Sequence, residues 1–343
     1  MATNRHFLLF LALVITVLTQ RIGHAAPPYS GTAYLNSNII TAADPTAFSG
    51  ISYVGQAQRK MYDRRPNAFI MLNAFVFNAT YVGEPATIEV QVNPEFGTPE
   101  AALVVAQKYA RVVGQLPGTG RSLAKTMWIH KGDYSFGGGN NNFLIHTARA
   151  EAQDALGFLE EILLHESGHT SLDGLHANAA GWVAAQRADP DFISTYARDN
   201  PTREDVAESW GPYLMLRHKS DRFPAAMADV IQRTIPNRIK YFDQLTLNLV
   251  PFVLEPLSVS ALSPSMDVDA GQTMSLIVVI TGSGPLAYQW YEGQSSDDSK
   301  PIPNANGAQL TTPALMSTTH FWVRSANPFG SVVDSPTVEI RVR

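Results

Sequence analysis

The stretch ALGFLEEILLHESGH, residues 155–169, guides the interpretation of the rest of the sequence. Its apolar residues recur at helical spacing, so it predicts a helix with one buried face and a polar edge. His165 and His169 are four residues apart and therefore project from one face of that helix, one turn apart. Glu166 follows the first histidine directly. The stretch thus predicts two imidazoles on one helix face with a carboxylate beside them.

This spacing is typical of a metal site, although a single histidine here would more often be a packed core residue. Two imidazoles one turn apart can reach one cation at about 2.0–2.1 Å each. Bound zinc lowers the pKa of its water towards roughly 7, and an adjacent glutamate can take the proton. The pattern H-E-x-x-H is that of zinc peptidases. We therefore expect His165 and His169 as zinc ligands and Glu166 as general base and later proton donor.

A catalytic zinc needs a third protein ligand, and the sequence offers three candidates. The chain has no cysteine, so the ligand must be His, Asp or Glu. Glu204 and Glu208 lie four residues apart on a predicted helix and face the same way, although acids in such a place usually form a solvated helix face. His176 follows the second histidine by seven residues. Asp173 lies beside Gly174 and suits a capping role better than a ligand role.

The acidic pair resembles the second motif of the gluzincins. There the first acid of an E-x-x-x-[DE] segment ligates zinc, and the second holds a ligand histidine. The resemblance implies Glu204 as third ligand and Glu208 as the orienting partner. The metzincins have an interval of six residues before their third histidine and a glycine where this chain has Leu172, so His176 is off register. Glu204 is preferred, with His176 as the alternative.

Two further features depend on a resemblance to zincins. In that class a Tyr, His or Arg often stabilises the oxyanion of the tetrahedral intermediate. The sequence does not choose among the neighbouring candidates, which are Tyr196, Arg198, Arg203 and Tyr213. The predicted strand 142–147 could be the sheet edge that pairs with an extended substrate, and a buried interior strand fits the same residues.

The organisation of the chain predicts two domains after a targeting segment. Residues 26–65 are turn-rich, with few clear signals. Strands are expected at 68–81, 86–92, 126–130 and 142–147, and a helix at 98–114. Further helices are expected at 154–171, 178–188, 190–198, 202–218 and 222–240. Strands followed by helices indicate an α+β fold, here a zincin-like metallopeptidase domain over residues 26–253.

Residues 254–343 differ in character, because short strands and turns alternate there. Strands are expected at 275–280, 287–291, 320–325 and 337–342. The segment resembles the immunoglobulin-like modules appended to many bacterial secreted proteins, which implies an all-β sandwich. The resemblance implies that Trp290 is the core tryptophan and that Val278 and Val323 replace the inter-sheet cysteines. Such a module could bind a surface ligand or act as a spacer.

The N-terminus predicts a secretory signal peptide over residues 1–25. A short basic start precedes an apolar run from Phe7 to Leu18, and small residues around Ala25 offer a cleavage site. An apolar core of about twelve residues is too short to span a bilayer, which needs about 20. We therefore expect a secreted or periplasmic protein without an integral membrane segment. The net charge of −5, without long charge runs, argues against a nucleic-acid partner.

These observations predict a secreted zinc-dependent hydrolase, in the form of a metalloprotease that acts on a protein or peptide. One alternative is a non-catalytic secreted or surface binding protein, in which the metal stabilises a scaffold and the immunoglobulin-like domain mediates adhesion. Another is a zinc hydrolase of a non-peptide amide, such as one in a cell-wall polymer. The sequence leaves open the substrate and whether a propeptide is removed from the segment before about Arg65.

Overall fold

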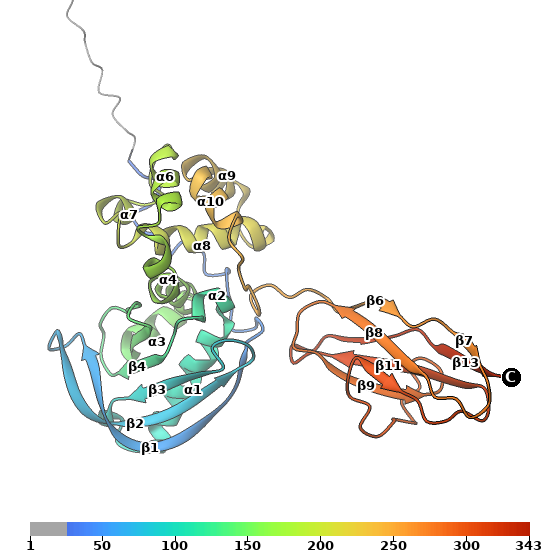
Figure 1. Ribbon diagram of the computed structural model, residues 1–343. Helices are drawn as coiled ribbons and strands as arrows, with labels where there is room; N and C mark the ends of the chain where they lie inside the picture. Colours follow the sequence, from blue (N-terminus) through green and yellow to red (C-terminus); the bar gives the residue numbers. More distant parts are fainter. Residues whose placement is uncertain (1–25) are drawn as a thin grey trace, which may run out of the picture.

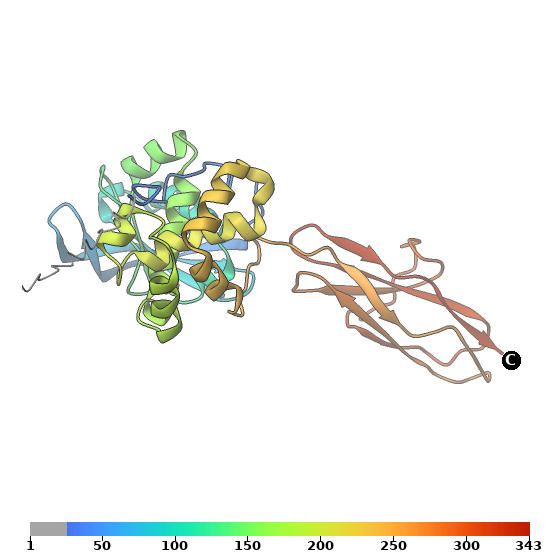
Figure 2. The same ribbon diagram turned by 90° about the horizontal axis from the view of Figure 1, so that it is seen from above.

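The computed structural model describes residues 26–343, so the predicted signal peptide lies outside the described residues. Two separate hydrophobic cores divide this part of the chain, one reaching from Ile39 to Phe252 and the other from Leu276 to Ile340. Figure 1 shows the first core inside a unit of helices and sheet, and the second inside a β-sandwich. An extended segment joins the two units (Figure 2). Every helix within residues 26–343 is too short or too polar to cross a membrane.

The first unit contains a five-stranded sheet in the order β1-β2-β3-β4-β5. Its strands are β1 Phe48–Asp63, β2 Ala68–Tyr81, β3 Thr87–Val92, β4 Thr126–His130 and β5 Asn142–His146. The first three strands are antiparallel, and β3, β4 and β5 run parallel. Strand β1 was not predicted from the sequence, because most of its residues are exposed or half-buried and give no apolar run. Pairing with β2 along nearly its whole length holds the strand in place.

Helices cover one face of this sheet and form the rest of the unit (Figure 1). Their bounds are η1 Pro94–Phe96, α1 Pro99–Gln115, α2 Gly118–Arg121, α3 Thr147–Ala155, α4 Leu159–Ser171, α5 Asp173–His176, α6 Ala180–Ala188, α7 Thr195–Asp199, α8 Asp205–His218, η2 Ser220–Arg222, α9 Ala225–Thr234 and α10 Pro236–Asp243. The helix α1 begins as predicted, because the hydroxyl of Thr98 accepts a hydrogen bond from the backbone N–H of Ala101 at 3.2 Å.

Two predicted helices are broken in the structure. The helix expected at 154–171 is replaced by α3 and α4, with Gly157 between them at a φ of 78°. This left-handed conformation suits glycine and cannot continue an α-helix. The helix expected at 222–240 divides into α9 and α10 at Ile235, which precedes Pro236. A residue before proline is disfavoured in the helical conformation.

A buried ion-pair network fixes the start of α8. The guanidinium of Arg238, on α10, is fully buried and lies 2.9 Å from Asp205 and 2.9 Å from Asp189. A buried charge is costly unless it is paired and hydrogen-bonded, so these three side chains depend on one another. The network therefore ties the first turn of α8 to α10 and to the segment after α6.

The second unit is an immunoglobulin-like β-sandwich. One sheet has the order β10-β8-β6; the other has β12-β11-β13-β7, with β9 paired to β11. The strands are β6 Ser258–Leu262, β7 Met266–Val268, β8 Ser275–Thr281, β9 Ala287–Glu292, β10 Gln309–Thr311, β11 Thr319–Ala326, β12 Val332–Asp334 and β13 Val338–Val342. Trp290 is fully buried, and Val278 and Val323 enter the same core from opposite sheets. This arrangement agrees with the places predicted for these three residues.

Candidate metal centre

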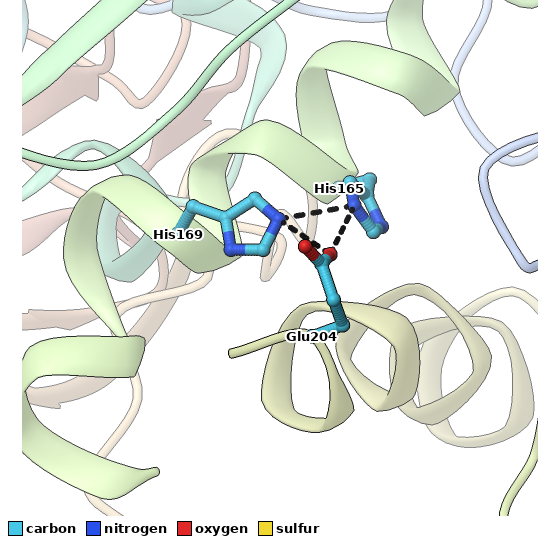
Figure 3. A group of neighbouring side chains, drawn as sticks. All are labelled: His165, His169 and Glu204. Carbon is cyan, nitrogen blue, oxygen red and sulfur yellow. Dashed lines mark hydrogen bonds and ion pairs between the residues drawn. The ribbon is translucent and has the colours of Figure 1, made fainter. Parts of the chain in front are cut away.

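Three side chains converge beside α4, two from this helix and one from the residue before α8. The Nε2 atoms of His165 and His169 lie 3.2 Å apart. Oε2 of Glu204, at the residue before α8, lies 3.1 Å from Nε2 of His169 and 3.7 Å from Nε2 of His165 (Figure 3). Within residues 26–343, these three residues form the group whose ligand atoms lie close enough together to hold one metal ion. The structure thus brings Glu204 to the two histidines of the H-E-x-x-H stretch.

The separations of these atoms fit a zinc ion. Two ligand atoms that each lie about 2.0–2.1 Å from a tetrahedral ion are roughly 3.4 Å apart. The distances of 3.1, 3.2 and 3.7 Å bracket this value. Oε2 of Glu204 is buried and accepts no hydrogen bond from the residues described. Two imidazoles and one carboxylate are also the ligand set of one well-known class of catalytic zinc site.

Each imidazole has a carboxylate on its other nitrogen. Nδ1 of His169 lies 2.6 Å from Oδ2 of Asp173. Nδ1 of His165 lies 3.5 Å from Oε1 of Glu208, whose other oxygen accepts the backbone N–H of Thr32 at 2.8 Å. Such partners fix the ring orientation and leave Nε2 free for a cation. Asp173, considered as a ligand or cap, therefore lies behind His169, and Glu208 occupies the place expected for it.

The carboxylates make this point of the molecule strongly favourable for positive charge. Burial alone would lower the pKa of His169, but Asp173 and Glu204 outweigh it and raise that pKa to about 10. Burial would raise the pKa of Glu204, but His165 and His169 outweigh it and hold that pKa below its ordinary value. A divalent cation held by the same three side chains satisfies the same electrostatic preference.

Close contact between α4 and α8 positions the acids. A Cβ atom added to Gly168 would lie 2.7 Å from Cα of Ala207, so the two helices touch at backbone distance. Ala207 lies between Glu204 and Glu208 in the sequence. The glycine inside H-E-S-G-H therefore allows α8 to come close enough for Glu204 to reach both histidines and for Glu208 to reach His165.

The three convergent residues line a cavity of about 690 Å³. Its wall also includes Gly31, Ala33 and Tyr34 of the N-terminal segment and the Gly-rich segment 135–139. Glu166 lies in this wall, half-buried, and its carboxylate makes no hydrogen bond within the described residues. A carboxylate that is unengaged and lies beside the candidate metal centre is available to exchange a proton with a bound molecule.

The residues considered for oxyanion stabilisation separate into two groups. Tyr196 and Arg203 line the cavity. The hydroxyl of Tyr196 donates to Oε1 of Glu204 at 2.9 Å, and its side chain is 47% exposed. Tyr213 is buried in the core, and Arg198 pairs with Asp199 outside the cavity wall. Of the four, Tyr196 is thus the one that hydrogen-bonds to a convergent side chain within the described residues.

His176 lies elsewhere. Its Nδ1 is 2.8 Å from the hydroxyl of Tyr241, on α10, and it lines a second, smaller hollow. It is absent from the group that could hold an ion within the described residues. His176 therefore lies away from the three convergent side chains, although it is close to His169 in the sequence.

The strand β5 ends the sheet, yet the Gly-rich segment covers part of its outer edge. Gly137 exchanges two backbone hydrogen bonds with Leu144, at 3.1 and 2.8 Å. A Cβ atom on Gly138 would clash with the carbonyl of Glu166 and lie 2.8 Å from Cβ of His169. The segment 135–139, rather than β5, faces the cavity.

The N-terminal segment has a role at this site that was not predicted from the sequence. Thr32 holds Glu208 through its backbone N–H, and its hydroxyl donates to the carbonyl of Glu208 at 2.8 Å. Glu161 accepts the backbone N–H groups of Leu35 and Asn36, both at 3.0 Å. No periodicity in residues 26–47 signals this role, because the segment is irregular and makes its contacts with distant parts of the chain.

No protein-family model matches this chain, and no curated protein is similar to it in sequence. Among solved structures it resembles immunoglobulin domains 1 and 2 of DIP-gamma, at 17% identity over 26% of this chain and 50% of that chain, with a TM-score of 0.23. The tandem immunoglobulin repeats of Dlar match at 10% identity over 26% and 49%, with a TM-score of 0.22. A twitchin kinase fragment from C. elegans, with kinase and immunoglobulin domains, matches at 14% over 55% and 53%, with a TM-score of 0.22.

The chain spans about half the length of these solved structures. Their TM-scores are too low to carry an argument about this protein. The description of residues 254–343 as an immunoglobulin-like sandwich rests on its own strand pairing and its buried tryptophan.

Proposed function

We propose that this protein is a secreted zinc-dependent hydrolase that cleaves peptide bonds, and that its first unit is a zincin-like metallopeptidase domain. One observation carries the proposal: Nε2 of His165, Nε2 of His169 and Oε2 of Glu204 converge within zinc-ligand distances of one another. Glu166 lies beside them in the wall of a cavity. Zinc ligands next to a free carboxylate in a cavity are what hydrolysis by an activated water requires.

The residues present would divide the work as follows. His165, His169 and Glu204 would hold the zinc, which when bound supplies Lewis acidity that acidifies a water and polarises an amide carbonyl. Glu166 accepts the proton that the water loses as its oxygen attacks the carbonyl carbon. The same carboxylate then gives this proton to the amine nitrogen as the C–N bond breaks. Asp173 and Glu208 keep the imidazoles in orientation.

Tyr196 has the chemistry to stabilise the oxyanion of the tetrahedral intermediate. Its hydroxyl lies on the cavity wall, and its single O–H, which donates to Oε1 of Glu204 at 2.9 Å, would have to turn from that oxygen to the oxyanion. A donor aimed at developing negative charge contributes to rate rather than to substrate affinity. Tyr196→Phe is expected to lower kcat with little change in KM, and steady-state kinetics on one peptide would measure this split.

The substitution Glu166→Gln tests the mechanism. We expect kcat/KM on a peptide library or casein to fall by at least about 10²-fold, the lower end of what a general base contributes. Zinc content, measured by mass spectrometry of the native protein, should stay at one ion because Glu166 is not a ligand. Glu151→Gln, on the exposed side of α3, is the matched control and should keep full activity. Full activity of Glu166→Gln would contradict the proposed mechanism.

Secretion belongs to the same proposal and has its own test. The basic start, the apolar run and the small residues before Ala26 support a cleaved signal peptide. Expression of the full chain in a secreting host should release a protein whose first residue is Ala26, as determined by N-terminal sequencing. Retention of the unprocessed chain inside the cells would contradict it.

The β-sandwich supports a second candidate function, binding to a surface partner. It has its own core and its own two sheets, and its strands supply no residue to the cavity wall. A chain ending at Val253 should keep peptidase activity and lose retention on the target surface, if the sandwich is an adhesion module. Surface retention without turnover by the intact chain would favour a binding protein over an enzyme.

A further inference from the structure

The cavity beside the candidate metal centre also has a positively charged part. Arg64, Arg149 and Arg203 all line it, and they come from the β1–β2 turn, α3 and the segment before α8. Three acids of the same wall lie within ion-pair distance of the two histidines, namely Asp173, Glu204 and Glu208. The fourth acid, Glu166, forms no ion pair within the described residues. The wall thus carries three arginines beside four acids, and three of these acids lie against the histidines rather than against the arginines.

Within the described residues, Arg64 combines the lack of an ion-pair partner with a buried, unsatisfied donor atom. Within residues 26–343 no carboxylate lies in ion-pair distance of it, whereas its neighbour Arg65 pairs with both Asp63 and Glu95. The Nη2 group of Arg64 donates to the backbone carbonyl of Phe136 at 2.6 Å. Its Nε is buried and donates to nothing in the described residues. A buried donor left without an acceptor is costly, and in native structures such a group usually marks a missing partner.

The other two arginines are less well suited to hold a ligand by themselves. Arg149 pairs with Asp133 at 2.6 Å, and both side chains are partly exposed, at 39% and 65%. Arg203 is exposed and lies next to Glu204 in the sequence. The charge of Arg149 is thus offset by Asp133, and that of Arg203 is open to screening by solvent.

Arg64 and His169 lie against two adjacent residues of the Gly-rich segment. Nη2 of Arg64 is 3.2 Å from the position that a Cβ atom of Gly137 would take. At the next residue, Gly138, a Cβ atom would lie 2.8 Å from Cβ of His169. The Cα atoms of two adjacent residues such as Gly137 and Gly138 are about 3.8 Å apart. A peptide whose cleaved amide lies at His169 could therefore reach the guanidinium of Arg64 with a residue close to that amide. A side chain or chain end near the cleaved bond could therefore contact it.

We infer that the cavity selects an anionic substrate, with Arg64 binding a carboxylate of the peptide near the bond that is cleaved. This inference rests on the proposed function, whose substrate class it specifies. A guanidinium binds a carboxylate through charge-assisted, often bidentate hydrogen bonds, and its unpaired Nε supplies one of the donors. The carboxylate comes from an acidic side chain or from the C-terminus of a short peptide.

Matched peptide substrates separate these two sources. Fluorogenic peptides would differ only by Glu, Gln or Lys at each position flanking the cleaved bond, each with a free or an amidated C-terminus. We expect kcat/KM to be about tenfold higher for Glu than for Gln at one position, as a charge-assisted bond to a partly exposed group allows. A preference that follows the free C-terminus instead identifies a terminal carboxylate, which the inference also includes.

Variants of Arg64 test whether this residue is responsible. Arg64→Gln should remove the preference, and Arg64→Glu should reverse it in favour of Lys. Arg187→Gln removes one charge from the exposed end of α6, outside the cavity wall, and should leave the preference unchanged. Equal loss of activity on all peptides in Arg64→Gln would show that Arg64 only holds Phe136 in place, and would overturn the inference.

A binding measurement distinguishes failure of this inference from failure of the proposed function. In the full chain carrying Glu166→Gln, calorimetry would compare the Glu and Gln peptides without turnover. Tighter binding of the Glu peptide that is lost on Arg64→Gln supports anion selection, even if the unmodified chain cleaves no peptide. Equal binding of the two peptides, together with equal cleavage by the unmodified chain, overturns anion selection and leaves the peptidase proposal standing.

Discussion

The two units of this protein differ in what they bury. The first unit buries charged and titratable side chains, among them His165, Glu204, Glu208, Asp205 and Arg238. In the β-sandwich the buried polar residues are uncharged, namely Ser283, Thr312, Ser325, Asn327 and Ser335. Burying charge lowers stability unless partners compensate for it, and perturbed groups gather at functional sites. The difference is consistent with the proposal that places the catalytic site in the first unit.

The largest expected effect concerns the third ligand. Glu204→Ala should lower zinc affinity by more than the 10–100-fold that loss of an outer partner costs, because it removes a ligand itself. His176→Ala should leave the affinity nearly unchanged, since His176 contacts Tyr241 instead. Competition with a chromogenic chelator measures both. Retained affinity in Glu204→Ala with loss in His176→Ala would reverse the assignment.

The next effect compares an ion pair in each unit. Arg238→Met leaves Asp189 and Asp205 buried without a cation and should lower the free energy of unfolding by about 3–5 kcal/mol. Arg324→Met breaks the partly exposed pair with Asp334 in the sandwich and should cost only about 0–1 kcal/mol. Urea unfolding followed by far-ultraviolet circular dichroism gives both values. Similar costs would mean that burial does not distinguish the two units.

The pH dependence of stability should arise in the first unit. Burial lowers the pKa of His130 to about 4, and the nearby Asp63 and His146 act in opposite directions on it. Between pH 6.5 and 4 the unfolded chain binds a proton at this residue that the folded chain does not, so stability falls as the pH falls. The fall amounts to roughly 3 kcal/mol for this residue.

His130→Leu tests that dependence. The variant is expected to be less stable at pH 7, because Asn93 loses its partner at 3.0 Å, but its stability should depend less on pH between 6.5 and 4. Urea unfolding at several pH values would show the slope. An unchanged slope would exclude His130 as its source.

The smallest predicted effect concerns the contact between α4 and α8. Gly168→Ala should destabilise the first unit by about 1–3 kcal/mol, because the added methyl group meets Ala207. Gly211→Ala, on α8, meets nothing within 4 Å and should stabilise by about 0.5–1 kcal/mol, as expected for glycine in a helix. Thermal unfolding of both variants with and without zinc measures this. A tolerated Gly168→Ala with unchanged zinc affinity would argue against the close contact.

Much of the local structure follows from the sequence alone. The strands β2 and β4 have the predicted bounds, and α1 begins at the predicted cap, because periodicity and capping act over a few neighbouring residues. The spacing of His165 and His169 follows from the helical repeat for the same reason. Strand β1 was missed, since an exposed strand is specified by its partner rather than by its own residues.

The closure of the candidate site was decided by tertiary structure. His176 is nearer to His169 in the sequence than Glu204 is, yet it contacts Tyr241, while Glu204 reaches both histidines. The approach of α8 at Gly168 produces this result, and no local pattern encodes the path of the chain between α4 and α8. The sequence therefore determined which helix carries the imidazoles, and the packing of that helix determined which acid lies beside them.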